Sequence, residues 1–470
     1  MDKKRGGGKF LKKKDNTKLL LYEPNVYKSF IILALPVFGA NFMKAFNDLV
    51  DTFFIGQMQN SVAAQASIAL TWPIINIFVS FQIGLSIAGV AVISQFLGAE
   101  KDDEAREYAG ILFVLSVVLG IAINIILFLI CPSVIRGMGA TDMVYEYSVQ
   151  YVRIRSMEML FAFIFACFQA VRQSQGDTVT PVILQVTAVM INIVLTGVFV
   201  KILGLGVFGA GLATVIGQIV ICPACIYYLF IRKENLKLRR KNLKLKNWDK
   251  VRKLTFIATP SAASQALSSF GFLILNTLIL DYGAVVTAAF SVGNKISNML
   301  LMPVLAIGSV LAAYVGQNIG AGNIKRAKQA YKVSRNLSLW ISIIGSLIIF
   351  PLRQEVIALL TNDANTQREA INYMIWVLVT MPLMAMFQNY VGVFNGSGNT
   401  KYSFIMETAR LWVVRLPMIL LLKNFTNFGS DGIWFAMNAS NLIIIILGAI
   451  LLRRVDFSAS ISSGKEEITL

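Results

Sequence analysis

Long apolar segments recur along the whole chain and are separated by short polar ones, as in segment 111–131. A helix that crosses a bilayer needs about 20 mostly apolar residues. A membrane β-barrel would instead show strands of about ten residues with alternating polarity. Because lipid offers the backbone no hydrogen-bond partners, the long continuous runs predict membrane-spanning helices.

Twelve helices account for the pattern and predict an all-α membrane protein. The expected spans are 28–56, 61–88, 104–131, 145–173, 179–201, 207–231, 252–281, 284–312, 328–351, 368–394, 401–423 and 431–452.

The two halves of the chain repeat each other at offsets of 222 to 224 residues. The matching positions, in chain order, are 36 with 260, 95–99 with 317–321, 176–178 with 398–400, and 206–209 with 429–432. Each pair is six helices apart, an even number, so the repeats have the same orientation in the membrane. We therefore predict two six-helix lobes related by a pseudo-twofold axis along the membrane normal, with a substrate site between them.

This organisation divides the chain into five parts. They are a cytoplasmic basic N-terminal segment over 1–27, an N-lobe of helices 1 to 6 over 28–231, a cytoplasmic basic linker over 232–251, a C-lobe of helices 7 to 12 over 252–454, and a cytoplasmic tail over 455–470.

The chain carries 43 Lys and Arg against 25 Asp and Glu, a formal net charge of +18. Most of the basic residues lie before the first helix, between helices 6 and 7, and before helix 9. The loops of the opposite side hold few: Arg136, Lys201, Arg353, Arg368 and Lys423. The positive-inside rule therefore predicts that both termini are cytoplasmic. Attraction to anionic lipid headgroups explains these basic loops, and we expect no nucleic-acid partner.

Enzymatic chemistry has no support in the residue types. The chain has no histidine, which removes the usual proton shuttle and the commonest zinc ligand. The cysteines are in or beside apolar helices, as expected of core residues: Cys131, Cys167, Cys222 and Cys225. We find no paired-carboxylate motif or phosphate-cradling loop, and expect no enzyme and no cofactor.

The first helix holds the most informative charges, because ionisable side chains inside a membrane are costly and mark function. Asn41, Lys44, Asp48 and Asp51 fall within about 80° on one face of this helix. Lys44 lies four residues before Asp48, so the two can pair. Asp51 has no evident partner in its own helix and is either an interfacial cap or a group that binds and releases a proton.

Several motifs together resemble the multidrug and toxic compound extrusion (MATE) transporters of bacteria, with the DinF-like branch closest. They are Pro36 followed by 50–56 (VDTFFIG), 192–195 (NIVL), 206–214 (GVFGAGLAT) and 315–322 (VGQNIGAG). The resemblance covers residues 25–455. It implies twelve helices in two lobes, a multi-pass position in the bacterial cytoplasmic membrane, and export of cationic or amphipathic small molecules driven by inward H⁺ or Na⁺ flow. We expect a monomer.

The resemblance also implies a coupling site in the N-lobe. Asp51 matches the first-helix carboxylate of the family, Asn192 its helix-5 amide and Thr214 its helix-6 threonine, whereas Thr196 stands where the family has a second carboxylate. One carboxylate among neutral oxygens can house a proton or bind Na⁺ weakly. Proton coupling is favoured, and Asp51 is kept as a possible Na⁺ ligand.

Other polar or flexible side chains within the spans are candidates for lining the substrate cavity. They are Asn41, Asp48, Gln185, Gln218, Gln265, Asn276, Met384 and Gln388. The C-lobe positions that match the family's second-half site hold amides and no carboxylate.

Two pairs of charged residues have the spacing of structural ion pairs, Arg155 with Glu158 and Glu407 with Arg410. The roles of Lys44, Lys295 and Arg410 stay open.

An alternative function is a flippase of a lipid-linked precursor from the same superfamily. Such proteins often have fourteen helices and several cavity-lining cationic residues, whereas this chain has twelve predicted helices and few intramembrane arginines. The sequence therefore favours small-molecule efflux.

Overall fold

The structure, a computed structural model, describes residues 17–58, 60–232, 236–243, 245, 247–457 and 461. The N-terminal half comprises α1 (Thr17–Leu21), α2 (Val26–Gly56), α3 (Ser61–Gly98), α4 (Asp102–Gly137), α5 (Asp142–Ser174), α6 (Val179–Thr196), η2 (Gly197–Ile202), α7 (Gly206–Ile226), η3 (Tyr227–Ile231) and η4 (Arg240–Leu243).

The C-terminal half comprises α8 (Trp248–Leu280), α9 (Ala284–Gly320), α10 (Ile324–Ala358), α11 (Ala364–Ser397), α12 (Thr400–Thr408), η5 (Ala409–Arg415), α13 (Leu416–Phe425) and α14 (Ser430–Arg453). Within the described residues, eleven helices are long and apolar enough to cross a membrane. The predicted eleventh span is divided, because η5 is a π-helical segment between α12 and α13. The predicted twelve-helix, two-lobe architecture is confirmed.

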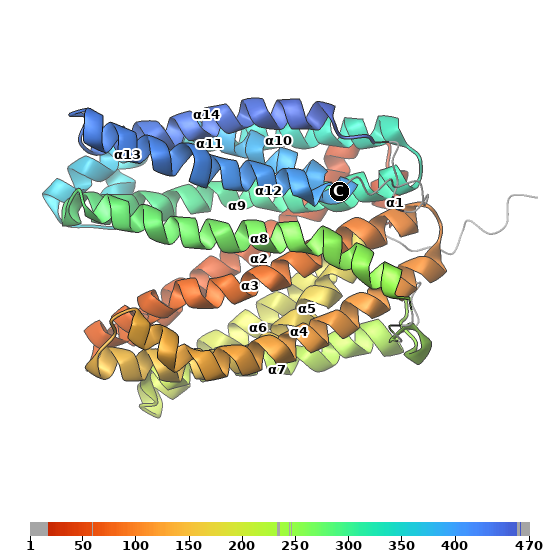
Figure 1. Ribbon diagram of the computed structural model, residues 1–470, viewed down its shortest axis with the longest axis horizontal. Helices are drawn as coiled ribbons and strands as arrows, with labels where there is room; N and C mark the ends of the chain where they lie inside the picture. Colours follow the sequence, from red (N-terminus) through yellow and green to blue (C-terminus); the bar gives the residue numbers. More distant parts are fainter. Residues whose placement is uncertain are drawn as a thin grey trace, which may run out of the picture.

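Two groups of helices form the molecule, with α2 to α7 in one and α8 to α14 in the other (Figure 1). The groups lie side by side at the end that holds α1 and the C-terminus, and they diverge towards the opposite end. The closed end also carries the basic loops. There α8 reaches the N-lobe, because Lys250 pairs with Glu104 and Glu107 of α4.

A reciprocal pair of glutamine amides joins the lobes at this closed end. Gln95 of α3 donates to the Gly396 carbonyl of α11 at 3.2 Å, and Gln317 of α9 donates to the Ser174 carbonyl of α5. Both donors and both acceptors are 222 residues apart, so the two bonds are related by the internal repeat. Both glutamines are fully buried, where an unmade amide hydrogen bond would be costly.

Glycines allow α3 and α9 to approach at backbone contact between these glutamines. A Cβ on Gly98 would overlap the Gln317 carbonyl oxygen, and a Cβ on Gly320 would overlap the Gln95 carbonyl oxygen. Two matched glycine turns extend the symmetry to the ends of the helices. Gly176 and Gly398 both adopt the left-handed conformation, with φ of +77° and +82°.

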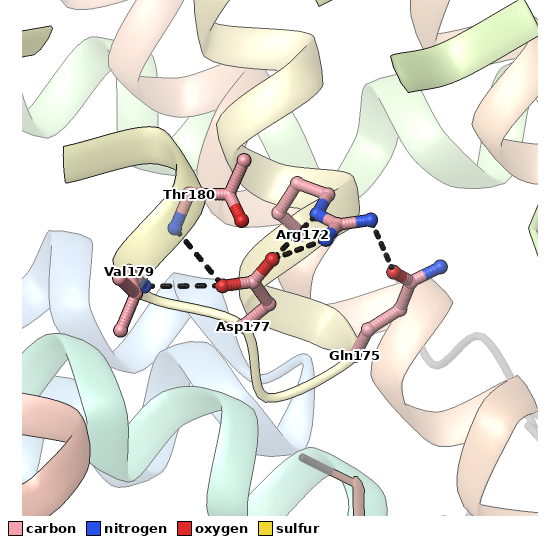
Figure 2. A network of polar contacts seen from close by, with 5 residues as sticks. All are labelled: Arg172, Gln175, Asp177, Val179 and Thr180. Carbon is pink, nitrogen blue, oxygen red and sulfur yellow. Dashed lines mark hydrogen bonds and ion pairs between the residues drawn. The ribbon is translucent and has the colours of Figure 1, made fainter. Parts of the chain in front are cut away.

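The turn from α5 to α6 is fixed by a buried network (Figure 2). Asp177 accepts from the Arg172 guanidinium, with an Nε–Oδ2 distance of 2.8 Å, and from the backbone N–H groups of Val179 and Thr180 at 3.1 and 3.0 Å. The carboxylate therefore caps α6 and neutralises Arg172 together. Burial alone would raise the pKa of Asp177, but the Arg172 guanidinium and the hydrogen bonds from Thr180 hold this pKa below its ordinary value.

Helix lengths differ from the predicted spans for a physical reason. α3 continues to Gly98, about three turns beyond the predicted end at 88, and α9 continues to Gly320, about two turns beyond the predicted end at 312. Bilayer thickness sets how much of a helix must be apolar, whereas these extensions are stabilised by packing against the other lobe.

The predicted terminal and linker segments also contribute to packing. Leu20 of α1 is fully buried against the C-lobe, and Leu236 and Leu238 of the linker pack on the N-lobe core. Ile461 of the tail is buried as well, and its N–H donates to Gln95. Residues 1–16 and 462–470 lie outside the described residues. The four cysteines are buried and unbridged, as expected of core residues.

The glycine crossing generates a stability prediction. Gly320→Ala places a methyl group against the Gln95 backbone, and such overpacking costs about 1–3 kcal/mol. Gly39→Ala is the matched control, because nothing lies within 4 Å of its Cβ position and alanine is favoured within a helix. We expect the first variant alone to unfold at a lower temperature in detergent. Equal melting temperatures would contradict the close crossing.

The Asp177 network generates a pH prediction. A carboxyl whose pKa is depressed on folding stabilises the protein above its unfolded pKa of about 3.9, and this contribution is lost as the pH falls through the folded value. Asp177→Asn retains the helix cap but removes the carboxylate that pairs with Arg172, at a cost of about 3 kcal/mol at neutral pH. Thermal unfolding of both proteins between pH 7 and pH 3 should show a difference that shrinks below about pH 4. A difference independent of pH would exclude the charge as its cause.

Candidate functional site

Asp51 of α2 accepts hydrogen bonds from its own helix and from α6. Thr196, the last residue of α6, donates its hydroxyl to Oδ1 at 3.1 Å, and Asn47 of α2 donates its side-chain amide to Oδ2 at 3.1 Å. α2 and α6 are 145 residues apart at this contact, so the Asp51–Thr196 bond is tertiary. The π-helical segment η2 begins directly after Thr196, and such segments occur frequently at functional sites.

The other two predicted coupling residues form a second contact. The Asn192 amide of α6 donates to the Thr214 hydroxyl of α7 at 2.9 Å, and Thr214 donates to the Ala210 carbonyl. The amide oxygens of Asn192 and Gln218 are buried without a hydrogen-bond partner. The structure therefore brings the four predicted side chains together as two pairs, Asp51 with Thr196 and Asn192 with Thr214, and leaves acceptor oxygens beside them.

A positive charge from α5 faces this group. Arg155 forms the predicted ion pair with Glu158, at 2.8 Å, and its field also acts on Asp48 and Asp51. Lys44 does not form the direct ion pair with Asp48 that its spacing allowed, although both carboxylates Asp48 and Glu158 attract it. The charges of α2 and α5 thus form one connected electrostatic cluster.

The predicted cavity residues have different surroundings. Gln185 is buried in α6, whereas Asn41, Gln218, Gln265, Met384 and Gln388 are partly exposed and Asp48 and Asn276 are exposed. Met384 accepts a hydrogen bond from Arg410 at 3.3 Å. These placements leave the cavity assignment a prediction.

The expected Glu407–Arg410 pair does not form. Glu407 instead accepts a hydrogen bond from the Ser264 hydroxyl of α8, and the Arg410 guanidinium lies over the Phe387 ring at 4.4 Å. The π-helical segment η5 begins at Ala409, between the two residues, and its wider turn changes the direction of the side chains that follow. The expectation of ordinary i,i+3 geometry was wrong here. It also means that the C-lobe interior is not limited to neutral amides.

Two contributors to the N-lobe site were not predicted in this role. Asn47 lies one turn before Asp51, a spacing that the sequence contains, but it does not belong to the polar stripe on which the prediction was based. Arg155 is assigned to a local pair by its sequence position, and only the packing of α5 brings its charge near α2.

The contact between α2 and α6 generates a prediction. Thr196→Val removes the hydroxyl and leaves one oxygen of Asp51 without its donor, which should cost about 1–3 kcal/mol of folding free energy. Thr187→Val is the matched control on the same helix, because its exposed hydroxyl binds only the Ile183 carbonyl. Melting temperatures of the purified variants in detergent should fall for Thr196→Val alone. An equal effect of both changes would mean that the Asp51 contact adds no stability.

Comparisons with known proteins find similar sequences and similar folds. The MatE family model matches residues 36–198 and 260–421, one segment in each lobe. The chain is 24% identical over 433 residues to the probable multidrug resistance protein YoeA of Bacillus subtilis (strain 168), covering 90% of this chain and 93% of that protein. It is also 24% identical to the probable multidrug resistance protein NorM of Thermotoga maritima, covering 88% and 90%.

A solved structure has the same fold. It is an outward-facing conformation of a multidrug resistance MATE family transporter of the MOP superfamily, with a TM-score of 0.87, 22% identity, and coverage of 93% of this chain and 97% of that one. The family model, the relatives and the fold lead to one conclusion: the chain belongs to the MatE family, and it is a multi-pass membrane transporter of the multidrug efflux type rather than an enzyme.

Proposed function

We propose that this protein is a proton-coupled antiporter that exports cationic or amphipathic small molecules by alternating access, with Asp51 as the residue that carries the coupling ion. The observation that supports this most directly is the position of Asp51, a carboxylate inside a membrane lobe that is bound by a second helix through Thr196. Intramembrane carboxylates are costly and mark ion pathways.

The single carboxylate of this site favours H⁺ over Na⁺ as the coupling ion. Asp51 is the only carboxylate among the four predicted coupling residues, because Thr196 stands where the family has a second one. One carboxylate among neutral side chains can house a proton, whereas it would hold Na⁺ only weakly. Asp51 therefore binds a proton in one conformation and releases it in another.

α2 is placed to couple this proton to movement of the lobes. Its first half contacts the C-lobe, where Phe30 stacks on Tyr314 with ring centroids 5.1 Å apart, and its second half binds α6 through Asp51. Pro36 lies between the two contacts and removes a backbone hydrogen bond from the helix. Protonation of Asp51 loosens the contact with α6, and α2 bends near Pro36. The opening between the lobes then closes on one side of the membrane and forms on the other.

Charge accounts for substrate class and orientation. Asp48 is exposed on the polar face of α2 and attracts a cationic substrate. The closed end of the molecule carries the basic loops, which the positive-inside rule assigns to the cytoplasm. Both termini are then cytoplasmic, in the cytoplasmic membrane of a bacterium, and the lobes open outward in this conformation.

Efflux measurements test the role of Asp51. Asp51→Asn keeps the size and hydrogen-bonding capacity of the side chain but cannot exchange a proton. We expect efflux of a cationic dye from vesicles with an imposed pH gradient to fall at least tenfold to the background of empty vesicles.

Asp281→Asn is the matched control, because Asp281 is an exposed carboxylate in the turn after α8 that pairs with Lys423. It should transport as the parent does. Undiminished transport by Asp51→Asn would overturn the proposed role, and Na⁺-dependent transport at equal pH would replace H⁺ as the coupling ion.

A further inference from the structure

The C-lobe contains a buried carboxylate that the proposed mechanism does not use. Glu407 of α12 is 7% exposed, and its hydrogen-bond partner is the hydroxyl of Ser264 on α8. Within the described part of the chain it forms no ion pair. The contact is part of a parallel packing of α8 and α12, in which Thr400 binds the Ile257 carbonyl two turns earlier.

The elements around Glu407 present few charges to it. α8 contributes the neutral hydroxyl of Ser264, and α11 contributes Tyr390, which packs with the neighbouring Met406. α14 contributes Ser440 and Asn441, both uncharged, which bind Arg415 about two turns further along. The nearest cation along the chain is Arg410, in η5.

Arg410 is directed away from Glu407. Its guanidinium lies over the Phe387 ring at 4.4 Å, and Nη1 donates to the Met384 sulfur of α11 at 3.3 Å. Its Nε is buried without a hydrogen-bond partner. Arg410 therefore interacts with an aromatic ring and a thioether and does not neutralise Glu407 by direct contact.

An unpaired carboxylate in this position cannot remain charged without a large cost. Removing the partner of a buried charge is strongly destabilising, and a single serine hydroxyl does not replace a cation. The group is neutral when it carries a proton. In a conformation that admits water, or that lets Arg410 turn towards it, the charged form becomes affordable and the proton leaves.

We propose that Glu407 is a second proton-carrying residue, so that each lobe holds one carboxylate that is loaded and unloaded in every transport cycle. This inference rests on the proposed antiport by Asp51 and extends it. Two protons then enter for each substrate molecule that leaves. For a substrate with one positive charge, the cycle moves one net positive charge inward, and a membrane potential alone can drive it.

Proteoliposomes and ethidium, a permanent monocation, give a direct test. With equal pH on both sides, a K⁺ gradient and valinomycin impose an interior-positive potential. This potential opposes passive entry of the dye and leaves a one-for-one exchange unaffected. A two-proton exchange instead accumulates ethidium inside, by about tenfold for 60 mV, because 59 mV corresponds to a factor of ten for one charge.

Variants locate the second proton. Glu407→Gln should lose accumulation driven by the potential and keep accumulation driven by a pH gradient. Glu369→Gln is the matched control, because this C-lobe carboxylate binds the Trp434 indole outside the proposed site, and it should keep both.

The outcomes separate this inference from the proposed function. A parent protein that responds to the pH gradient but not to the potential overturns the second proton and leaves the antiport intact, whether or not Glu407→Gln folds. A full response to the potential in folded Glu407→Gln overturns the assignment to this residue. If the parent transports no ethidium under either force, or if Asp51→Asn transports as the parent does, the proposed function itself is wrong.

Discussion

The backbone contact between α3 and α9 is the constraint on which the rest of the structure depends. Gln95 and Gln317 hold the two lobes together by two hydrogen bonds that are equivalent under the internal repeat. Gly98 and Gly320 bring the two helices close enough for these bonds to form. The lobes are thereby fixed to each other at one end. Away from this junction the lobes remain separate and can rotate relative to each other. A two-lobed transporter requires this freedom.

The same frame holds different chemistry in its two halves. In the N-lobe, carboxylates, Arg155 and Thr196 form one connected cluster around Asp51. In the C-lobe, Glu407 and Arg410 are three residues apart yet have separate partners on different helices. A repeat fixes where helices cross, because glycine and glutamine positions must match at the crossing. It does not fix interior side chains, which contact only their own lobe.

Much of the fold could be predicted because its causes are local. Apolar runs identify the helices, and matched positions such as Gly176 and Gly398 identify the repeat, which the structure bears out with a left-handed turn at both. Asp51 stood out because a membrane charge is costly. The partners of Glu407 could not be predicted, since the i,i+3 rule assumes α-helical geometry and η5 departs from it. The long ends of α3 and α9 were missed because contact between lobes, and not the bilayer, stabilises them.

The placement of α2 explains why a small chemical event can move whole lobes. This helix contacts the C-lobe through Phe30 and the N-lobe through Asp51, so it belongs to both bodies. A proton on Asp51 changes one hydrogen-bonded contact, which is worth a few kcal/mol at most. That amount is comparable to the free-energy gap between conformations that are both populated. A change in one side chain is therefore sufficient to shift the balance, provided that the junction of α3 and α9 permits both arrangements of the lobes.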